Sequence, residues 1–151
     1  MFICSIKMSR KKLALAGAAI LLAVLIGVGF AFAKKNAPDR PGGDDAARLA
    51  FLSSFGWTAA ASPEESVQVA IPAEFDQIYE NYNALQFSQG FDLTPYRGQT
   101  VERYTYQVLN YPDQPEMRAS LLICNGRIIG GDLHLPQLDG FMCNFKGEPV
   151  S

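Results

Sequence analysis

The chain has 151 residues with one histidine and three cysteines, and its formal net charge is −2. Residues after Lys35 contain all 15 acidic side chains but only seven basic ones, a net charge of −8. A nucleic-acid partner is therefore excluded, because binding to a phosphate backbone requires a basic surface. The lone histidine and scattered cysteines lack the paired spacing of zinc ligands, so we expect no metal and no cofactor.

Residues 13–33 form an uninterrupted apolar run, LALAGAAILLAVLIGVGFAFA, with two lysines directly before it and two directly after it. About 20 helical residues cross a hydrocarbon core of about 30 Å, so the run predicts one transmembrane helix in a lipid bilayer. Residues 1–12 are basic, which favours a cytoplasmic tail. We therefore expect a single-pass protein of the cell membrane whose C-terminal domain is extracytoplasmic.

A cleaved signal peptide is the alternative. Ala31-Phe32-Ala33 has the small-x-small pattern of a cleavage site, and cleavage near Ala33 would give a secreted protein. The apolar run is longer than the usual signal core of about 7–15 residues, which favours a retained anchor. In either case Cys124 and Cys143 would lie in an oxidising compartment, where they could pair or remain free thiols.

Residues 34–43 are rich in proline, glycine and polar side chains, and predict a flexible linker before a domain at 44–151. A first helix is expected after Asp44 or Asp45 as N-cap, ending at Gly56. Trp57 follows, and we expect its ring to hold the helix end against a sheet, with ligand stacking as the alternative.

Residues 65–71 alternate apolar and polar side chains and predict a half-buried strand. Pro72 is expected at the first position of a second helix that ends at Gly90. The predicted apolar face of this helix comprises Phe75, Ile78, Tyr79, Tyr82 and Leu85. The predicted polar face, which is either solvated or a partner contact, comprises Glu74, Gln77, Glu80, Asn81 and Asn83.

Three further strands are predicted at 101–110, 117–124 and 127–133. Asn125-Gly126 indicates a type I′ hairpin, which pairs Ile123 with Ile128 and Leu121 with Gly130. Gly130-Gly131 marks either the crossing of the second helix or a bulge. The predicted fold class is α+β in the order α-β-α-β-β-β, with an antiparallel sheet packed against a helix.

Candidate functional residues are few. His134 and Asp132 lie two apart on one strand face, a spacing that could orient the imidazole for general-base work with a serine nucleophile. No G-x-S-x-G nucleophile turn is present, so no catalytic residue is assigned. The apolar segment at 140–142 is either a lid on the core or a partner contact. The candidate partner surface comprises Trp57, Tyr111, His134, Phe141 and Met142.

Several stretches carry a family resemblance: LAFLSSFGW at 49–57, IPAEF at 71–75, YENYNALQFSQGFDL at 79–93, YRGQTVERYTYQVLNYP at 96–112, IIGGD at 128–132 and LDGFM at 138–142. The chain resembles a membrane-anchored family of Gram-positive bacteria known as domain of unknown function 4830. The resemblance implies a bacterial cell-envelope setting and a short N-terminal anchor, but no activity.

We therefore expect a non-enzymatic binding or interaction module of the cell envelope, whose partner is another envelope protein or a peptide. An envelope hydrolase, or a hydrolase inhibitor, using the region around Asp132 and His134 is one alternative. A purely structural component of the envelope is the other.

Overall fold

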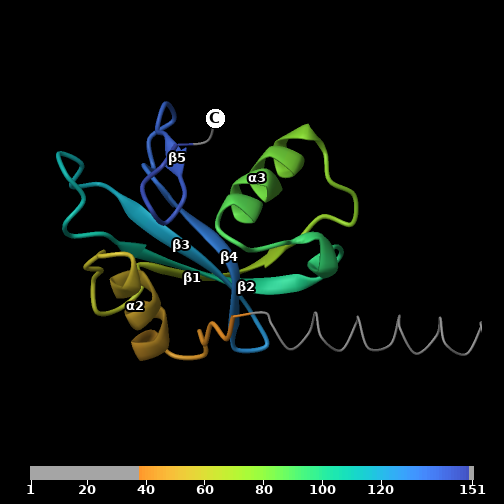
Figure 1. The fold of residues 1–151 in the computed structure, drawn as a ribbon, viewed down its shortest axis with the longest axis horizontal. Coiled ribbons are helices and arrows are strands. Elements are labelled where there is room, and N and C mark those ends of the chain that lie inside the picture. The colour runs from red at the N-terminus through yellow and green to blue at the C-terminus, as the bar shows by residue number, and fades with distance from the viewer. Residues whose placement is uncertain (1–37, 150–151) are drawn as a thin grey trace, which may run out of the picture. The chain divides into compact units, whose positions relative to one another are not determined.

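Five antiparallel strands form one sheet in the order β1-β2-β3-β4-β5, so each strand pairs with its neighbours in sequence (Figure 1). The computed structural model describes residues 38–149. The strands are β1 (Glu65–Ala70), β2 (Thr100–Gln107), β3 (Arg118–Cys124), β4 (Arg127–His134) and β5 (Met142–Cys143). The helices are α2 (Asp45–Ser54), α3 (Gln77–Ser88) and the 3₁₀ turn η1 (Thr94–Tyr96).

The predicted fold class is confirmed as α+β with an antiparallel sheet, and the predicted order of elements holds from α2 to β4. The two-residue strand β5 was not predicted, because the sequence around it has no alternating run. The predicted transmembrane helix at 13–33 lies outside the described residues. Neither helix within residues 38–149 has the length and hydropathy of a membrane span.

Successive residues of a strand point to opposite faces of the sheet, and here both faces carry apolar side chains. Leu121 and Ile123 pack with Leu52 of α2 in one cluster, whereas Leu122 packs on the other face. Tyr79 and Tyr82 of α3 lie against that second cluster. Figure 1 shows the two helices on opposite sides of the sheet. The prediction of a single covering helix was therefore incomplete.

Helix α2 begins and ends where the sequence predicted. The Asp44 side chain accepts a hydrogen bond from the Ala47 amide at 2.8 Å, and Gly56 has a φ of +88°. The predicted linker, however, ends earlier than residue 43. The Gly42 amide donates to the Gly126 carbonyl at 2.9 Å, and Arg40 accepts from the Ile128 amide at 2.8 Å. Residues 40–43 are thus held against the β3–β4 hairpin.

Helix α3 differs from its prediction at both its start and its buried face. Asp76, not the residue before Pro72, is the N-cap, and its carboxylate accepts from the Tyr79 amide. Ile78 is 78% exposed, although it was assigned to the apolar face. Asn83 was assigned to the polar surface but is 3% exposed, because its Oδ1 accepts from the Leu93 amide at 2.8 Å.

The β3–β4 hairpin turns at Asn125-Gly126, both with positive φ as predicted, and pairs Ile123 with Ile128. Beyond that pair a bulge shifts the register, so Leu121 lies opposite Gly131 rather than Gly130. Both interpretations of Gly130-Gly131, a bulge and a close approach of the second helix, agree with the structure. Besides the bulge, α3 lies close by: a Cβ added to Gly130 would approach Gln86 Oε1 to 2.9 Å.

Cys124 and Cys143 are free thiols in the structure. Cys124 is half-buried at the end of β3, and Cys143 is fully buried in β5. Of the two alternatives for this pair, the structure therefore has the unpaired one. Burial raises the pKa of the Cys143 thiol, which keeps it in the neutral form.

Candidate functional site

A groove runs across the sheet on the face that carries α3. Its volume is about 340 Å³, within the range of about 300–1,000 Å³ that is usual for ligand sites. Tyrosines of α3 form one wall, and polar side chains of the central strands form the floor. The groove is lined by Val69, Ala70, Tyr79, Tyr82, Arg103, Ser120, Leu122, Asp132, His134 and Met142.

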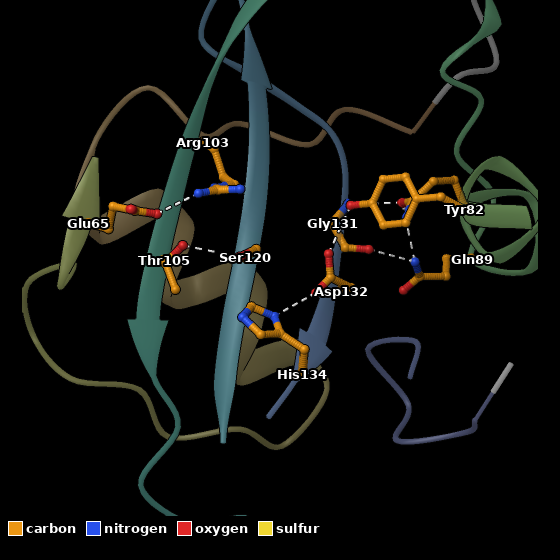
Figure 2. A network of polar contacts seen from close by, with 10 residues as sticks. Glu65, Tyr82, Gln89, Arg103, Thr105, Ser120, Gly131, Asp132 and His134 are labelled. Carbon is orange, nitrogen blue, oxygen red and sulfur yellow. Dashed lines mark hydrogen bonds and ion pairs between the residues drawn. The ribbon is translucent and has the colours of Figure 1, made fainter. Parts of the chain in front are cut away.

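A carboxylate and an imidazole form the polar centre of this groove (Figure 2). Asp132 is 4% exposed, and its Oδ1 lies 2.7 Å from Nδ1 of His134. The Tyr82 hydroxyl donates to Oδ2 of Asp132 at 2.8 Å. Burial, and then the charge of Asp132, raise the pKa of Tyr82 well above its usual value, so this hydroxyl remains a donor.

The predicted pairing of His134 with Asp132 is thus present. A carboxylate can only accept hydrogen bonds, so Nδ1 of the neutral imidazole carries the hydrogen and Nε2 is left as an acceptor. The ring is part-buried and lines the groove. This arrangement can orient the imidazole toward a ligand as hydrogen-bond acceptor or as general base.

Gln86 of α3 and its C-cap residue Gln89 fix the strand that carries these residues. Gln86 Oε1 accepts from the Gly131 amide at 2.9 Å, and Gln89 Nε2 donates to the Gly131 carbonyl at 3.0 Å. Only glycine fits here, since a Cβ would come within 2.1 Å of the Ser120 carbonyl oxygen. These contacts fix the backbone directly before Asp132.

A second hollow continues the groove over β2 and β3. It has a volume of about 430 Å³ and shares Arg103, Ser120 and His134 with the first. Arg103 donates to Glu65 at 2.7 Å, and its buried Nε has no hydrogen-bond partner among the described residues. Together the two hollows make one polar-floored groove, which we call the α3-side groove.

The hydroxyls of Ser120 and Thr105 on its floor are not hydrogen-bonded to the imidazole. Ser120 Oγ lies 3.1 Å from Thr105 Oγ1, and both residues are buried. Within residues 38–149 no hydroxyl shares a hydrogen bond with His134, so the base is not joined to a nucleophile as in a hydrolase triad. The same residues contain no group of three or more side chains able to hold a metal ion.

The candidate partner surface predicted from sequence divides into two parts. Trp57 and Tyr111 stack with ring centroids 5.2 Å apart, and Phe141 lies 6.2 Å from Tyr111. Trp57 and Tyr111 pack against the cluster on the α2 side, where the Trp57 indole donates to the Phe145 carbonyl at 2.6 Å. His134 and Met142 instead line the α3-side groove.

Sequence reasoning missed three residues of the groove: Tyr82, Arg103 and Ser120. Tyr82 was assigned to the core by its helical spacing, although its hydroxyl reaches the buried Asp132. Arg103 lies on the groove face of β2, two residues before Thr105 on the same face, so the alternation of β2 was the available signal. Ser120 had no signal, because it lies within an apolar run.

A comparison with known protein families shows to which family the chain belongs. A model described as "Domain of unknown function (DUF4830)" matches residues 51–133. The chain belongs to the DUF4830 family. The match includes Tyr82, Arg103, Ser120 and Asp132 of the groove, whereas His134 and Met142 follow it. No curated protein matches the chain, and no solved structure does.

Membership of the DUF4830 family confirms the resemblance seen in the sequence, and it carries no assigned activity. The matched segment runs from α2 almost to the end of β4. It therefore contains the last turn of α2, all of α3 and most of the α3-side groove.

Proposed function

We propose that this DUF4830 protein is a non-enzymatic binding module whose ligand is a segment of a partner protein or a peptide seated in the α3-side groove. The observation that carries the proposal is the composition of the groove. Apolar side chains such as Leu122 and Met142 surround a small convergent set of polar groups, which is the usual composition of a ligand site.

The polar groups of the groove can select and orient such a ligand. His134 presents Nε2. Arg103 contributes a cation, and among the described residues only its Nη2 is paired, with Glu65. A peptide offers both donors and acceptors on its backbone, and apolar side chains for the walls. The network that fixes Asp132 keeps the floor rigid, which reduces the entropic cost of binding.

The setting of this module follows from the N-terminal sequence. We propose that residues 13–33 anchor the protein in the cell membrane, with the groove presented on the extracytoplasmic side of a bacterial envelope. The apolar run, its flanking lysines and the acidic character of the remaining chain support this arrangement. A partner in this setting would be another envelope protein.

Site-directed photo-cross-linking in intact cells tests the proposal. A benzophenone amino acid replaces Tyr79, which lines the groove, or Phe87, which is 58% exposed on the same helix and outside the groove. We expect one reproducible adduct from position 79 that is absent from position 87, and mass spectrometry of the adduct identifies the partner.

A blocking variant provides the matched control. Met142→Trp places a large ring in the groove from a residue that is 39% exposed, and Leu109→Trp adds the same ring outside it. The adduct should disappear with Met142→Trp and persist with Leu109→Trp. Identical adducts from positions 79 and 87, or none from either, would refute a groove partner and favour the structural role.

Hydrolysis is a second candidate, favoured by the 2.7 Å contact between His134 and Asp132. A serine hydrolase of this kind would use Ser120 as nucleophile, after its hydroxyl turned from Thr105 toward His134. A fluorophosphonate probe should then label Ser120 in the wild type and fail to label it in His134→Asn. Absence of labelling in both proteins would remove this candidate.

A further inference from the structure

Strand β1 is one of the two edge strands of the sheet. It pairs with β2 on one side, and the sheet order places no described strand on its other side. Ser66, Gln68 and Ala70 are exposed. Natural proteins usually guard such an edge with proline, lysine or a bulge. Residues 65–70 contain neither proline nor lysine, and their register with β2 is continuous.

The direction of the backbone groups of β1 follows from its end. Ile71 lies opposite Gln99, and its amide donates to the Gln99 carbonyl at 2.8 Å. In an antiparallel ladder the backbone N–H and C=O groups of every second residue face the partner strand. Those of Val69 and Val67 therefore also face β2. The amides and carbonyls of Ser66, Gln68 and Ala70 therefore point outward, and no described residue bonds to them.

We propose that β1 pairs with β1 of a second copy of this chain, in antiparallel orientation, with Gln68 opposite the Gln68 of that copy. In this register Ser66 lies opposite Ala70, so the three outward-pointing residues of each strand exchange backbone hydrogen bonds with those of the other. A two-fold axis through Gln68 relates the copies, and the two five-stranded sheets become one of ten strands.

The side chains agree with this register. Val67 meets Val69 of the second copy on the groove face, so the apolar pair is repeated on both sides of the axis. Gln68 meets Gln68, and Glu65 meets the apolar Ile71. The chain after Lys35 carries a net charge of −8, yet residues 66–71 carry no charge. Two acidic copies can therefore approach along this strand without repulsion between like charges within residues 66–71.

Self-pairing would also bring the two grooves together. Val69 lines the α3-side groove, and in the proposed register it lies beside Val67 of the second copy. The groove faces of the two sheets would then be continuous across the axis. Pairing and ligand binding remain separable, because the hydrogen bonds come from the edge backbone rather than from the groove side chains.

Cysteine cross-linking of the full-length chain in intact cells tests the register. In a background with Cys4, Cys124 and Cys143 replaced by serine, we expect Gln68→Cys to give a disulfide dimer on mild oxidation. Hydrogen-bonded partners lie about 5.5 Å apart between Cα atoms, which a disulfide can span. Ser66→Cys is the matched control, since its two copies would lie four residues apart, roughly 13 Å.

A mixed pair and a proline variant complete the test. Coexpressed Ser66→Cys and Ala70→Cys chains should cross-link with each other but not with themselves. Gln68→Pro, made in the chain with its native cysteines, removes only an outward-pointing amide. This variant should be monomeric by light scattering, and its far-ultraviolet circular dichroism spectrum should match that of the wild type. A monomer at every concentration tested, or equal cross-linking at positions 66 and 68, would overturn the proposal.

The two proposals fail in different experiments. Loss of the adduct from position 79 with an intact Gln68 cross-link would remove the groove partner alone. Loss of the Gln68 cross-link with an intact adduct would remove the β1 pairing alone.

Discussion

Gln86 Oε1 accepts a hydrogen bond from the amide of Gly131, 45 residues further along the chain, at 2.9 Å. The side chain of Gln86 is completely buried although it is polar and helical. Burying a polar group without a hydrogen bond costs free energy, so the Oε1 contact favours turning this face of α3 inward, although Nε2 of Gln86 has no partner among the described residues. It also holds the bulged strand β4 immediately before Asp132, and so connects the helix to the polar centre of the groove.

Replacing Gln86 by methionine should destabilise the protein. The Gly131 amide would lose its acceptor in a buried position, which costs about 1–3 kcal/mol. Gln77→Met, on the exposed side of the same helix, should cost less than about 0.5 kcal/mol. Urea unfolding followed by circular dichroism measures the loss of unfolding free energy in both variants. Equal losses would show that the Gln86 contact does not stabilise the protein.

Gly131→Ala should be among the most damaging single substitutions. Its Cβ would meet the Ser120 carbonyl oxygen at 2.1 Å and the ring of Phe145 at 2.7 Å, so backbone must move. We expect a loss of about 3 kcal/mol or more. Gly56→Ala is the control, because it has a positive φ but nothing within 4 Å, and strain alone costs about 1–2 kcal/mol. Thermal denaturation distinguishes the two, and similar losses would contradict the close approach.

Asp45 should make stability depend on acidic pH. Hydrogen bonds from Tyr106 and then Arg48 lower its pKa from the usual value. A lowered pKa in the folded state adds stability above the unfolded value of about 3.9, and this stability is lost as the pH falls through the folded pKa.

Asp45→Asn should accordingly be less stable than the wild type at pH 7, and the difference should shrink as the pH falls below about 4. Asp113→Asn, in an exposed loop, serves as the control. Urea unfolding at a series of pH values gives the comparison. A difference for Asp45→Asn that does not change with pH would show that the carboxylate charge is not the stabilising feature.

His134 offers a direct spectroscopic test of the groove, because it is the only histidine of the chain. With Asp132 as acceptor, the neutral ring should carry its hydrogen on Nδ1. Long-range ¹H–¹⁵N spectra should show this tautomer in the wild type and a shift toward the Nε2–H form in Asp132→Asn. Tyr111→Phe, outside the groove, should leave the spectrum unchanged. A neutral wild-type ring with its only hydrogen on Nε2 would refute the contact.

Local sequence signals predicted the parts of this fold that depend on a few neighbouring residues. Asp44 and Gly56 delimit α2, and Asn125-Gly126 turns the hairpin, because capping side chains and positive φ angles act within one turn of backbone. The alternation along β2 likewise puts Tyr106 in the core and Arg103 on the groove face. These features follow from backbone preferences and periodicity alone.

Only half of the candidate site could be predicted, because only that half depends on residues that are close in sequence. His134 and Asp132 are two residues apart on one strand, so their pairing could be read from spacing. Tyr82 comes from a helix 50 residues away, and its role depends on where α3 crosses the sheet. No local pattern distinguishes a tyrosine that fills the core from one that donates to a buried carboxylate.

The sequence by itself determined the order of elements from α2 to β4, the caps of α2, the β3–β4 turn, and the acidic character of the chain after its apolar N-terminal run. Only the tertiary structure decided which face of α3 is buried, where β4 bulges and how Gln86, Gly131 and Asp132 come together. The physical reason is that periodicity counts apolar side chains, whereas Asn83 and Gln86 are buried through hydrogen bonds to backbone amides outside their helix. Such partners are in place only once the chain has folded around α3.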